Sequence, residues 1–492
     1  MEYQISKNSQ RGETVLDPFC GSGSVGLEAI LMGRNFIGYD LNPFAIKLCT
    51  STLSSSFDSE LFEVLLKEIL EEAKKDIMDL YKHGDKYILY SVPGLGNKQP
   101  YNLVLCDYDF QKIGQEFDPN LKVHYGARES IRSDIPDREF PAKFYKDRFS
   151  YKGVKKVSDL FSTRNLVALG ILRKAIRRLP VEHRLDFTLV LTNTVLHVSK
   201  LKSEKIRPLG VNNYWIPDDF IEENVIWRFI DRAKQFQIAK TAISARFESI
   251  DSLLTGKYDL RNSSSIPMDS IDASSIDYIL TDPPYGDVIQ YSELSFVWNV
   301  WLEEDQDQTA ELIVNPVQNK NDDYFLDKMA IFIRDCFRVL KPGRKFTLCF
   351  QNKDPEVWFK VAKIAAEAGF GLDMIETFDF LGSTFNKNWS KNSPKVDLYV
   401  TLVKLDNEAK LSPITLLDIN LTDLFELVEG DKNVADVDQV HDWYSKVIAI
   451  GITEILKGHT IIGFSKSVFS DFVLMRGGLK REDEKYIQAG LF

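Results

Sequence analysis

Two short segments hold the residues whose types and spacing could do chemistry. Asp17–Gly26 reads Asp-Pro-Phe-Cys-Gly-Ser-Gly-Ser-Val-Gly, and Thr281–Gly286 reads Thr-Asp-Pro-Pro-Tyr-Gly. Glycines spaced in this way allow a sharp turn and let a ligand approach the backbone closely. Consecutive prolines have fixed φ and no N–H, so they form a stiff turn of carbonyl acceptors. We call Asp17–Ser24 the glycine turn and Asp282–Tyr285 the proline corner.

The glycine turn favours a positively charged cofactor. The Asp17 carboxylate would repel the pyrophosphate of a dinucleotide, which a helix N-terminus otherwise attracts. It would attract the sulfonium and ammonium groups of S-adenosylmethionine instead. Asp40 ends the next apolar stretch and suits either cofactor, because a carboxylate can bind both ribose hydroxyls. We predict S-adenosylmethionine as the cofactor, with contacts from Asp17, Pro18, Phe19, Gly21, Ser22, Gly23, Asp40 and Asn42.

The proline corner predicts chemistry on an exocyclic amino group of a nucleic-acid base. Such a nitrogen is a poor nucleophile because its lone pair is delocalised into the ring. The Asp282 carboxylate and the Pro283 carbonyl could accept its two N–H groups and favour a more tetrahedral nitrogen. Tyr285 could stack on a base flipped out of a duplex, a contact worth about 1–3 kcal/mol. The predicted catalytic residues are Asp282, Pro283, Pro284 and Tyr285.

Both segments are expected at the ends of strands in one α/β sheet. Residues 13–50 read as an apolar strand, the glycine turn, a helix and a second apolar strand, which is one βαβ half of a doubly wound fold. An apolar strand also precedes the proline corner, and strand and helix patterns continue to residue 404. The glycine turn and the proline corner should therefore face one crevice.

Charge and length divide the rest of the chain. The 492 residues exceed one ordinary domain. The net charge is −11, yet residues 121–210 hold 20 Lys and Arg against 9 Asp and Glu, which is typical of a phosphate-binding footprint. We predict a core formed by residues 1–50 and 261–404, an inserted target-recognition region at 51–260, and a mostly helical C-terminal extension at 405–492.

Candidate nucleic-acid contacts lie in the inserted region. One predicted helix has a basic face that could contact phosphates, with a merely solvated surface as the alternative. An aromatic pair in an irregular polar segment could stack on or read bases. The predicted contacts are Arg173, Lys174, Arg177, Arg178, Tyr214 and Trp215.

Other features limit the class of protein. The five cysteines have no short-range pairs, so we expect reduced thiols and no metal site. No apolar run is long enough to span a bilayer, and the first residues do not form a secretory signal. We therefore expect a cytoplasmic protein without a membrane segment.

With both motifs in view, the sequence resembles the amino-group (N6-adenine or N4-cytosine) DNA methyltransferases, and among them the large adenine-specific methylases of the DUF1156 type. The resemblance covers most of residues 13–404. It implies a Rossmann-like, class I S-adenosylmethionine-dependent methyltransferase sheet with a large inserted mixed α/β region. It also implies a DNA partner, with RNA as the weaker alternative, and base flipping followed by in-line methyl transfer to adenine N6.

The sequence departs from this family in two places. Family members usually have a stretch before the glycine motif that helps to enclose the methionine end of the cofactor, but only sixteen residues precede Asp17. A partner subunit could complete that pocket. Some members contain a zinc ribbon with Cys-x-x-Cys pairs, whereas Cys106 is the one cysteine near the expected position.

Three alternatives stay open. An RNA guanine-N2 methyltransferase of the tRNA-modifying kind also uses a Thr-Asp-Pro-Pro-Tyr-Gly turn. A catalytically silent nucleic-acid-binding subunit of a modification or restriction complex would fit the short N-terminal stretch. A nicotinamide-dependent dehydrogenase is a more distant third, since it too would use a glycine turn.

Overall fold

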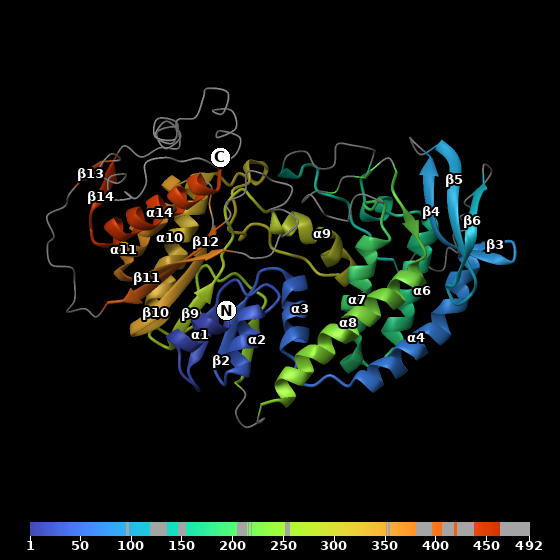
Figure 1. The fold of residues 1–492 in the computed structure, drawn as a ribbon, viewed down its shortest axis with the longest axis horizontal. Helices are drawn as coiled ribbons and strands as arrows, with labels where there is room; N and C mark the ends of the chain where they lie inside the picture. The colour runs from blue at the N-terminus through green and yellow to red at the C-terminus, as the bar shows by residue number, and fades with distance from the viewer. Residues whose placement is uncertain are drawn as a thin grey trace.

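The structure is a computed structural model that places a large sheet with its helices beside a second, mainly helical part (Figure 1). The residues it describes are 1–94, 98–118, 135–145, 154–203, 214, 216–217, 219–250, 256–350, 352, 355–379, 396–405, 418–420 and 437–462. Among these residues, no helix is long and apolar enough to cross a membrane.

A seven-stranded sheet forms the core, in the order β11-β12-β10-β9-β1-β2-β8. Strand β12 runs antiparallel to β10 and β11, and the other neighbouring pairs of this sheet are parallel. Numbered by their order in the chain, the strands run 3-2-1-4-5-7-6, which is the doubly wound order with an antiparallel last strand inserted near one edge. This confirms the predicted Rossmann-like α/β fold. The strands are β1 (Thr14–Asp17), β2 (Asn35–Tyr39), β8 (Tyr258–Arg261), β9 (Ile276–Thr281), β10 (Leu340–Phe350), β11 (Phe370–Asp379) and β12 (Val396–Lys404).

The strand pairing places the two motifs side by side. Strands β1 and β9 are parallel neighbours, with Leu16 opposite Ile279. Asp17 is the last residue of β1 and Thr281 is the last residue of β9. The glycine turn and the proline corner therefore leave the sheet at the same edge, as the carboxyl ends of parallel strands do.

Helices cover both faces of this sheet because its strand residues alternate between the faces. Leu16 and Ile279 pack into one cluster with α10, α11 and α14, and Val15 and Tyr278 pack into another with α1, α2 and α3. These helices are α1 (Glu2–Asn8), α2 (Ser24–Leu31), α3 (Pro43–Leu53), α10 (Asp322–Val339), α11 (Pro355–Ala368) and α14 (Val437–Leu456).

The second part has a sheet and a core of its own, on the right of Figure 1. Its sheet consists of β3 (Lys82–His83), β4 (Lys86–Gly94), β5 (Lys98–Cys106), β6 (Lys112–Asp118) and β7 (Glu222–Glu223). Its helices are α4 (Ser59–Leu80), η3 (Val157–Leu160), α6 (Thr163–Arg178), η4 (Val181–His183), α7 (Arg184–His197) and α8 (Val225–Glu248). The remaining elements are α9 (Tyr291–Leu302), η6 (Pro316–Gln318), β13 (Asp418–Asn420) and β14 (Thr460–Ile462).

Helix α9 connects the two parts. It begins five residues after Gly286, and its side chains Phe296, Val297 and Trp301 lie in the core of the second part. The segment that follows the proline corner is therefore packed directly against the second part.

The element boundaries differ from the predicted division in two places. Strand β8 begins at Tyr258, so the main sheet already includes residues that we assigned to the insert up to 260. Helix α14 of the predicted extension packs on α11, and Ile448 and Ile452 join the core of the main sheet. The division into core, insert and extension stays a proposal.

Candidate active site

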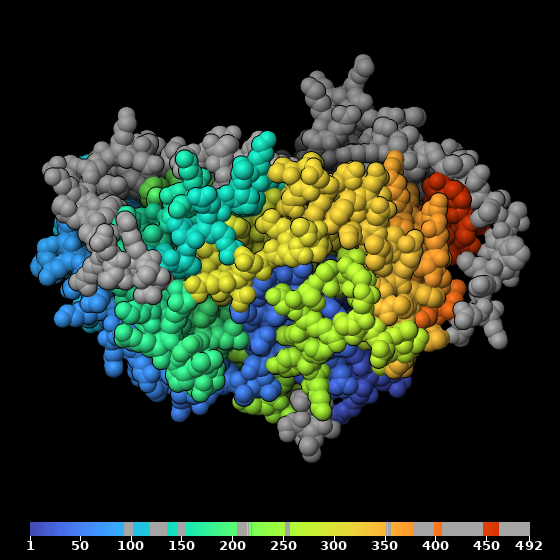
Figure 2. All heavy atoms as spheres, turned by 180° about the vertical axis from the view of Figure 1, so that it is seen from behind, coloured from blue at the N-terminus to red at the C-terminus, as the bar shows by residue number. Residues whose placement is uncertain are grey.

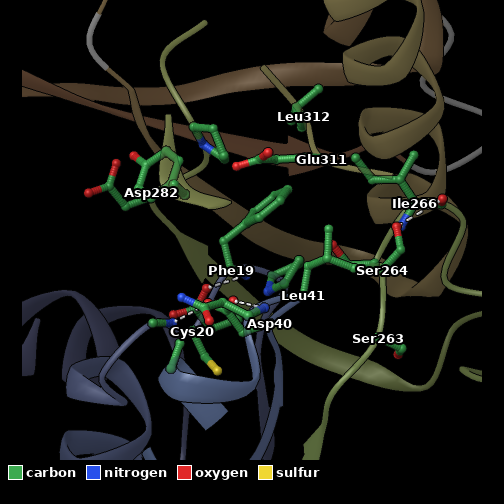
Figure 3. Close-up of a pocket in the computed structure, with 18 of the residues that line it drawn as sticks. Phe19, Cys20, Asp40, Leu41, Ser263, Ser264, Ile266, Asp282, Glu311 and Leu312 are labelled. Atoms are coloured by element: carbon green, nitrogen blue, oxygen red, sulfur yellow. Dashed lines mark hydrogen bonds between the residues drawn. The ribbon is translucent and has the colours of Figure 1, made fainter. Parts of the chain in front are cut away.

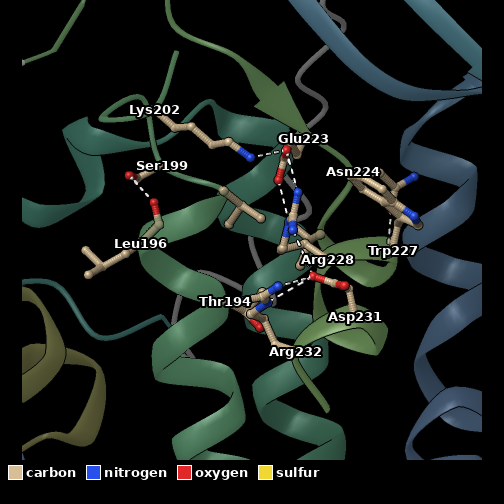
Figure 4. A network of polar contacts seen from close by, with 12 residues as sticks. Thr194, Leu196, Ser199, Lys202, Glu223, Asn224, Trp227, Arg228, Asp231 and Arg232 are labelled. Carbon is tan, nitrogen blue, oxygen red and sulfur yellow. Dashed lines mark hydrogen bonds and ion pairs between the residues drawn. The ribbon is translucent and has the colours of Figure 1, made fainter. Parts of the chain in front are cut away.

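The glycine turn and the proline corner open onto one cavity of about 360 Å³. This volume lies within the roughly 300–1,000 Å³ of small-molecule sites. The cavity is lined by residues 17–22 and 40–42 on one side and by Asp282 and Pro284 on the other. Figure 3 shows Phe19 between Cys20 and Asp40 below and Asp282 above. In Figure 2, the blue atoms of the N-terminal segment lie at the bottom of a hollow between yellow and yellow-green segments.

Asp17 joins the ends of the two central strands. Its Oδ1 accepts a hydrogen bond from Thr281 Oγ1 at 2.6 Å and another from Phe19 N at 3.1 Å. The side chain is only 3% exposed, and burial raises its pKa to about 7. A buried carboxylate with so high a pKa costs free energy to ionise unless a positive charge lies beside it.

The Asp40 carboxylate accepts hydrogen bonds from backbone N–H groups on both sides of the cavity floor. Gly21 N donates to its Oδ2 at 3.0 Å, and Asn42 N donates to its Oδ1 at 2.8 Å. Burial raises the pKa of Asp40 to about 6. The Asn42 side chain in turn caps α3 by accepting from Phe44 N. The Asp40 carboxylate thus connects the glycine turn, the end of β2 and the start of α3.

The glycines of the turn are required by its shape. Gly21 and Gly23 have φ of +50° and +86°, a region that side chains disfavour. Gly23 also lies against α3, where an added Cβ would come within 2.6 Å of Cys49 Sγ. Gly23 does not line the cavity, so it shapes the turn from behind.

The proline corner is held from several sides. The Tyr285 hydroxyl donates to Asp282 Oδ1, and the Tyr285 ring meets Phe350 edge to face at 5.9 Å. Asn352 Nδ2 donates to the Tyr285 carbonyl at 3.2 Å. Asp282 and Pro284 line the cavity, whereas Pro283 and Tyr285 do not. The corner therefore presents a carboxylate to the cavity in an orientation that Tyr285 fixes.

The cavity wall is acidic. Asp17, Asp40, Asp282 and Glu311 line it, and none of the described residues that line it is a lysine, arginine or histidine. Such a site attracts a cation and repels a phosphate or pyrophosphate. A sulfonium cofactor fits these residues, and a dinucleotide does not.

Several lining residues were not predicted. Four of them follow β8 at the same edge of the sheet: Ser263, Ser264, Ser265 and Ile266. Recognition of β8 as a core strand would have indicated these residues. Gln306, Glu311 and Leu312 come from the connection after α9. No pattern in the sequence marks that connection.

Of the four predicted phosphate contacts on the basic helix face, Arg173 is buried, whereas Lys174, Arg177 and Arg178 are exposed. Arg173 is 5% exposed and pairs with Glu303 at 2.6 Å. Arg177 also pairs with Glu303, and Arg178 pairs with Glu72. Burial corrects the prediction for Arg173, whereas Arg177 and Arg178 form ion pairs at the surface and stay candidates. Lys174 is exposed and stays a candidate.

Tyr214 is not placed for stacking on a base. It is 3% exposed, its hydroxyl donates to Leu294 O at 2.8 Å, and its ring packs near Phe140 and Phe144. The prediction for Tyr214 is therefore corrected: the side chain fastens α9 to the insert. Trp215 lies outside the described residues.

Comparison with known proteins finds a family that matches the segment with the glycine turn and two partial relatives. The DNA methylase family matches residues 1–51. The type II methyltransferase M.MjaII of Methanocaldococcus jannaschii is 29% identical over 165 residues, which is 30% of this chain and 30% of that protein. The type II methyltransferase M.BsoBI of Geobacillus stearothermophilus is 38% identical over 79 residues, which is 16% of this chain and 13% of that protein. This chain thus spans less than a third of either relative.

These matches support an S-adenosylmethionine-dependent amino-methyltransferase. A solved S-adenosylmethionine-dependent methyltransferase from Methanosarcina mazei is 11% identical, with 82% of this chain and 97% of that chain covered at a TM-score of 0.26. The likeness to the DUF1156 type stays a prediction. Among the described residues, no group of three or more His, Cys, Asp or Glu side chains could hold a metal ion.

Proposed function

We propose that this protein methylates an exocyclic amino group of a base in DNA, with adenine N6 as the favoured target and S-adenosylmethionine as the methyl donor. One observation carries the proposal: the glycine turn and the proline corner line a single cavity whose charged side chains, among the described residues, are all acidic. The match of residues 1–51 to DNA methylases and the two type II methyltransferase relatives support DNA as the substrate.

The cofactor residues would act by charge and shape. When bound, S-adenosylmethionine supplies a methyl group on a sulfonium, which is already a good leaving group. Asp40 would bind the ribose hydroxyls, and residues 17–22 would surround the methionine portion. Burial raises the pKa of Asp17 and of Asp40, so a cation in the cavity would favour their ionised forms.

The proline corner would hold the target nitrogen. The Asp282 carboxylate and the Pro283 carbonyl would accept its two N–H groups and direct its lone pair toward the donor. Tyr285 would support the flipped base and keep Asp282 oriented through its hydroxyl. Because the reaction needs little acid–base chemistry, positioning would provide most of the rate enhancement. An acidic cavity would admit a neutral base and reject a phosphate.

The test incubates the purified protein with radiolabelled cofactor and either duplex DNA or transcribed RNA, followed by digestion to nucleosides. We expect N6-methyladenine in DNA, and no product from Asp282→Ala. Asp287→Ala is the matched control, because Asp287 is an exposed acid just beyond the corner that does not line the cavity.

Other products would contradict parts of the proposal. N4-methylcytosine in DNA would overturn the adenine target, and N2-methylguanosine in RNA would overturn the DNA substrate. Binding of DNA with no cofactor binding and no product would favour the silent-subunit alternative.

A further inference from the structure

Four acidic side chains among the described residues line the cavity. Three of them come from the glycine turn, the end of the second strand and the proline corner, and Glu311 is the fourth. It lies on the connection between α9 and α10, and it is 4% exposed. In Figure 3 its carboxylate lies above Phe19, on the same side as Asp282 and across the cavity from Asp40. Glu311 therefore adds a negative charge to the side of the cavity where the methyl group would be transferred.

Local contacts hold the Glu311 carboxylate in place. Its Oε1 accepts from Ser292 N at 2.8 Å, and its Oε2 accepts from Ser292 Oγ at 2.5 Å. Ser292 is in the first turn of α9, where the N-cap residue Gln290 makes no side-chain capping bond. Glu311 thus satisfies a backbone N–H of α9 that the helix itself cannot pair.

The charge of Glu311 is only partly compensated by the protein. Lys320 is the nearby cation, but its Nζ donates to the backbone carbonyls of Gln308 and Glu311. Burial raises the pKa of Glu311, and the neighbouring Glu293 raises it further, while Ser292 and Lys320 lower it. The pKa of the Tyr291 hydroxyl is also raised, by burial and by the negative charges of Asp282, Glu311 and Asp40.

We infer that Glu311 is a specificity residue for the positive charge of the cofactor, which lets the site distinguish the sulfonium donor from its neutral thioether product. This inference rests on the proposed function. A buried carboxylate that lacks a full counter-charge gains most from a ligand that brings one. A thioether has the same shape as the donor without the methyl group and lacks the positive charge on sulfur. The affinity ratio of donor to product should therefore depend on Glu311.

The test measures the dissociation constants of S-adenosylmethionine and S-adenosylhomocysteine by isothermal titration calorimetry. Glu311→Gln keeps the size of the side chain, and its amide can still accept from Ser292 N and donate to Ser292 Oγ. We expect Glu311→Gln to bind S-adenosylmethionine roughly tenfold more weakly, with S-adenosylhomocysteine affinity unchanged within about twofold. Glu311→Asp keeps the charge and should keep the native affinity ratio.

Glu304→Gln is the matched control. Glu304 lies on the same connection but pairs with Lys47 at 3.1 Å and does not line the cavity, so its loss should leave both affinities unchanged. Equal weakening of both ligands in Glu311→Gln, or no change in either, would overturn the inference while leaving the proposed function intact. If the native protein bound neither ligand, the proposed function itself would fail.

Discussion

At the scale of single residues, the pair Asp17–Thr281 joins the glycine turn to the strand that leads into the proline corner. The two side chains come from residues 264 positions apart in the sequence and meet at 2.6 Å. Both are buried. A hydrogen bond to a buried carboxylate is among the stronger contacts of a protein, because the unpaired group would be left without water.

Removal of the Thr281 hydroxyl should therefore destabilise the protein. We expect Thr281→Val, which keeps the shape of the side chain, to lower the free energy of unfolding by about 1–3 kcal/mol. Thr281→Ser keeps the hydroxyl and should cost less. Urea denaturation of the three proteins measures the difference, and equal stability of the native protein and Thr281→Val would show that Asp17 does not need this donor.

The raised pKa values of Asp17 and Asp40 predict a pH dependence. Both rise from 3.8, to about 7 and about 6, so both groups stabilise the folded protein most below pH 4 and contribute less as the pH rises through 6 and 7. A cationic ligand favours the ionised carboxylates and reverses this loss. Cofactor affinity should therefore increase from pH 5.5 to 8, with proton release on binding.

Calorimetry in two buffers of different ionisation enthalpy measures that proton release directly. Asp17→Asn should flatten the upper part of the pH profile, because the group with the pKa of about 7 is removed. An affinity that is constant across this range, with no proton release, would show that neither carboxylate changes its ionisation when the ligand binds.

At the scale of elements, the glycine turn depends on close packing between the N-terminus of α2 and helix α3. Gly23→Ala would bring a Cβ within 2.6 Å of Cys49 Sγ at a φ of +86°. Gly12→Ala has a similar φ of +80° but no atom within 4 Å of the added Cβ. Gly12→Ala therefore reports the backbone strain alone.

We expect Gly23→Ala to lower the free energy of unfolding by about 1–3 kcal/mol more than Gly12→Ala, because overpacking adds to the strain. Cofactor affinity should fall in Gly23→Ala alone. Thermal unfolding and calorimetry of both variants make the comparison, and equal losses in the two would mean that the contact with α3 relaxes easily.

The sequence was sufficient to predict the two motifs and the edge of the sheet that they share, because both lie directly after apolar strands. Glu311 could not be predicted in this way. It lies on an irregular connection and reaches the cavity through the packing of α9, which no local pattern reports. Ser263–Ile266 were not predicted because the strand before them, β8, has only four residues and its sequence YDLR is weakly apolar.

At the scale of the whole molecule, helix α9 packs the inserted region against the part that holds the main sheet. Its Trp301 is buried in the insert core, and Tyr214 donates to the Leu294 carbonyl. The predicted basic face was wrong for Arg173, which is buried and paired with Glu303, a residue that lies far away in the sequence. Charge counts within a segment cannot reveal such pairs.

Lys174 is one of three exposed members of that face, with Arg177 and Arg178, that remain candidate phosphate contacts. If it contacts DNA, Lys174→Ala should weaken binding at all sequences alike and reduce the salt dependence of log Kd by about one unit. Lys67→Ala, which removes an exposed lysine from α4, is the control. Fluorescence anisotropy over a salt series measures the slopes, and identical slopes for native protein and Lys174→Ala would remove this residue from the interface.

The most direct test concerns the acidic cavity that the glycine turn and the proline corner share: the protein is titrated separately with two cofactors. Calorimetry with S-adenosylmethionine and with NAD⁺ should show one S-adenosylmethionine per chain, no NAD⁺ binding, and loss of S-adenosylmethionine binding in Asp40→Ala. Binding of NAD⁺ at the same site, or S-adenosylmethionine affinity unchanged in Asp40→Ala, would contradict the assignment of this cavity.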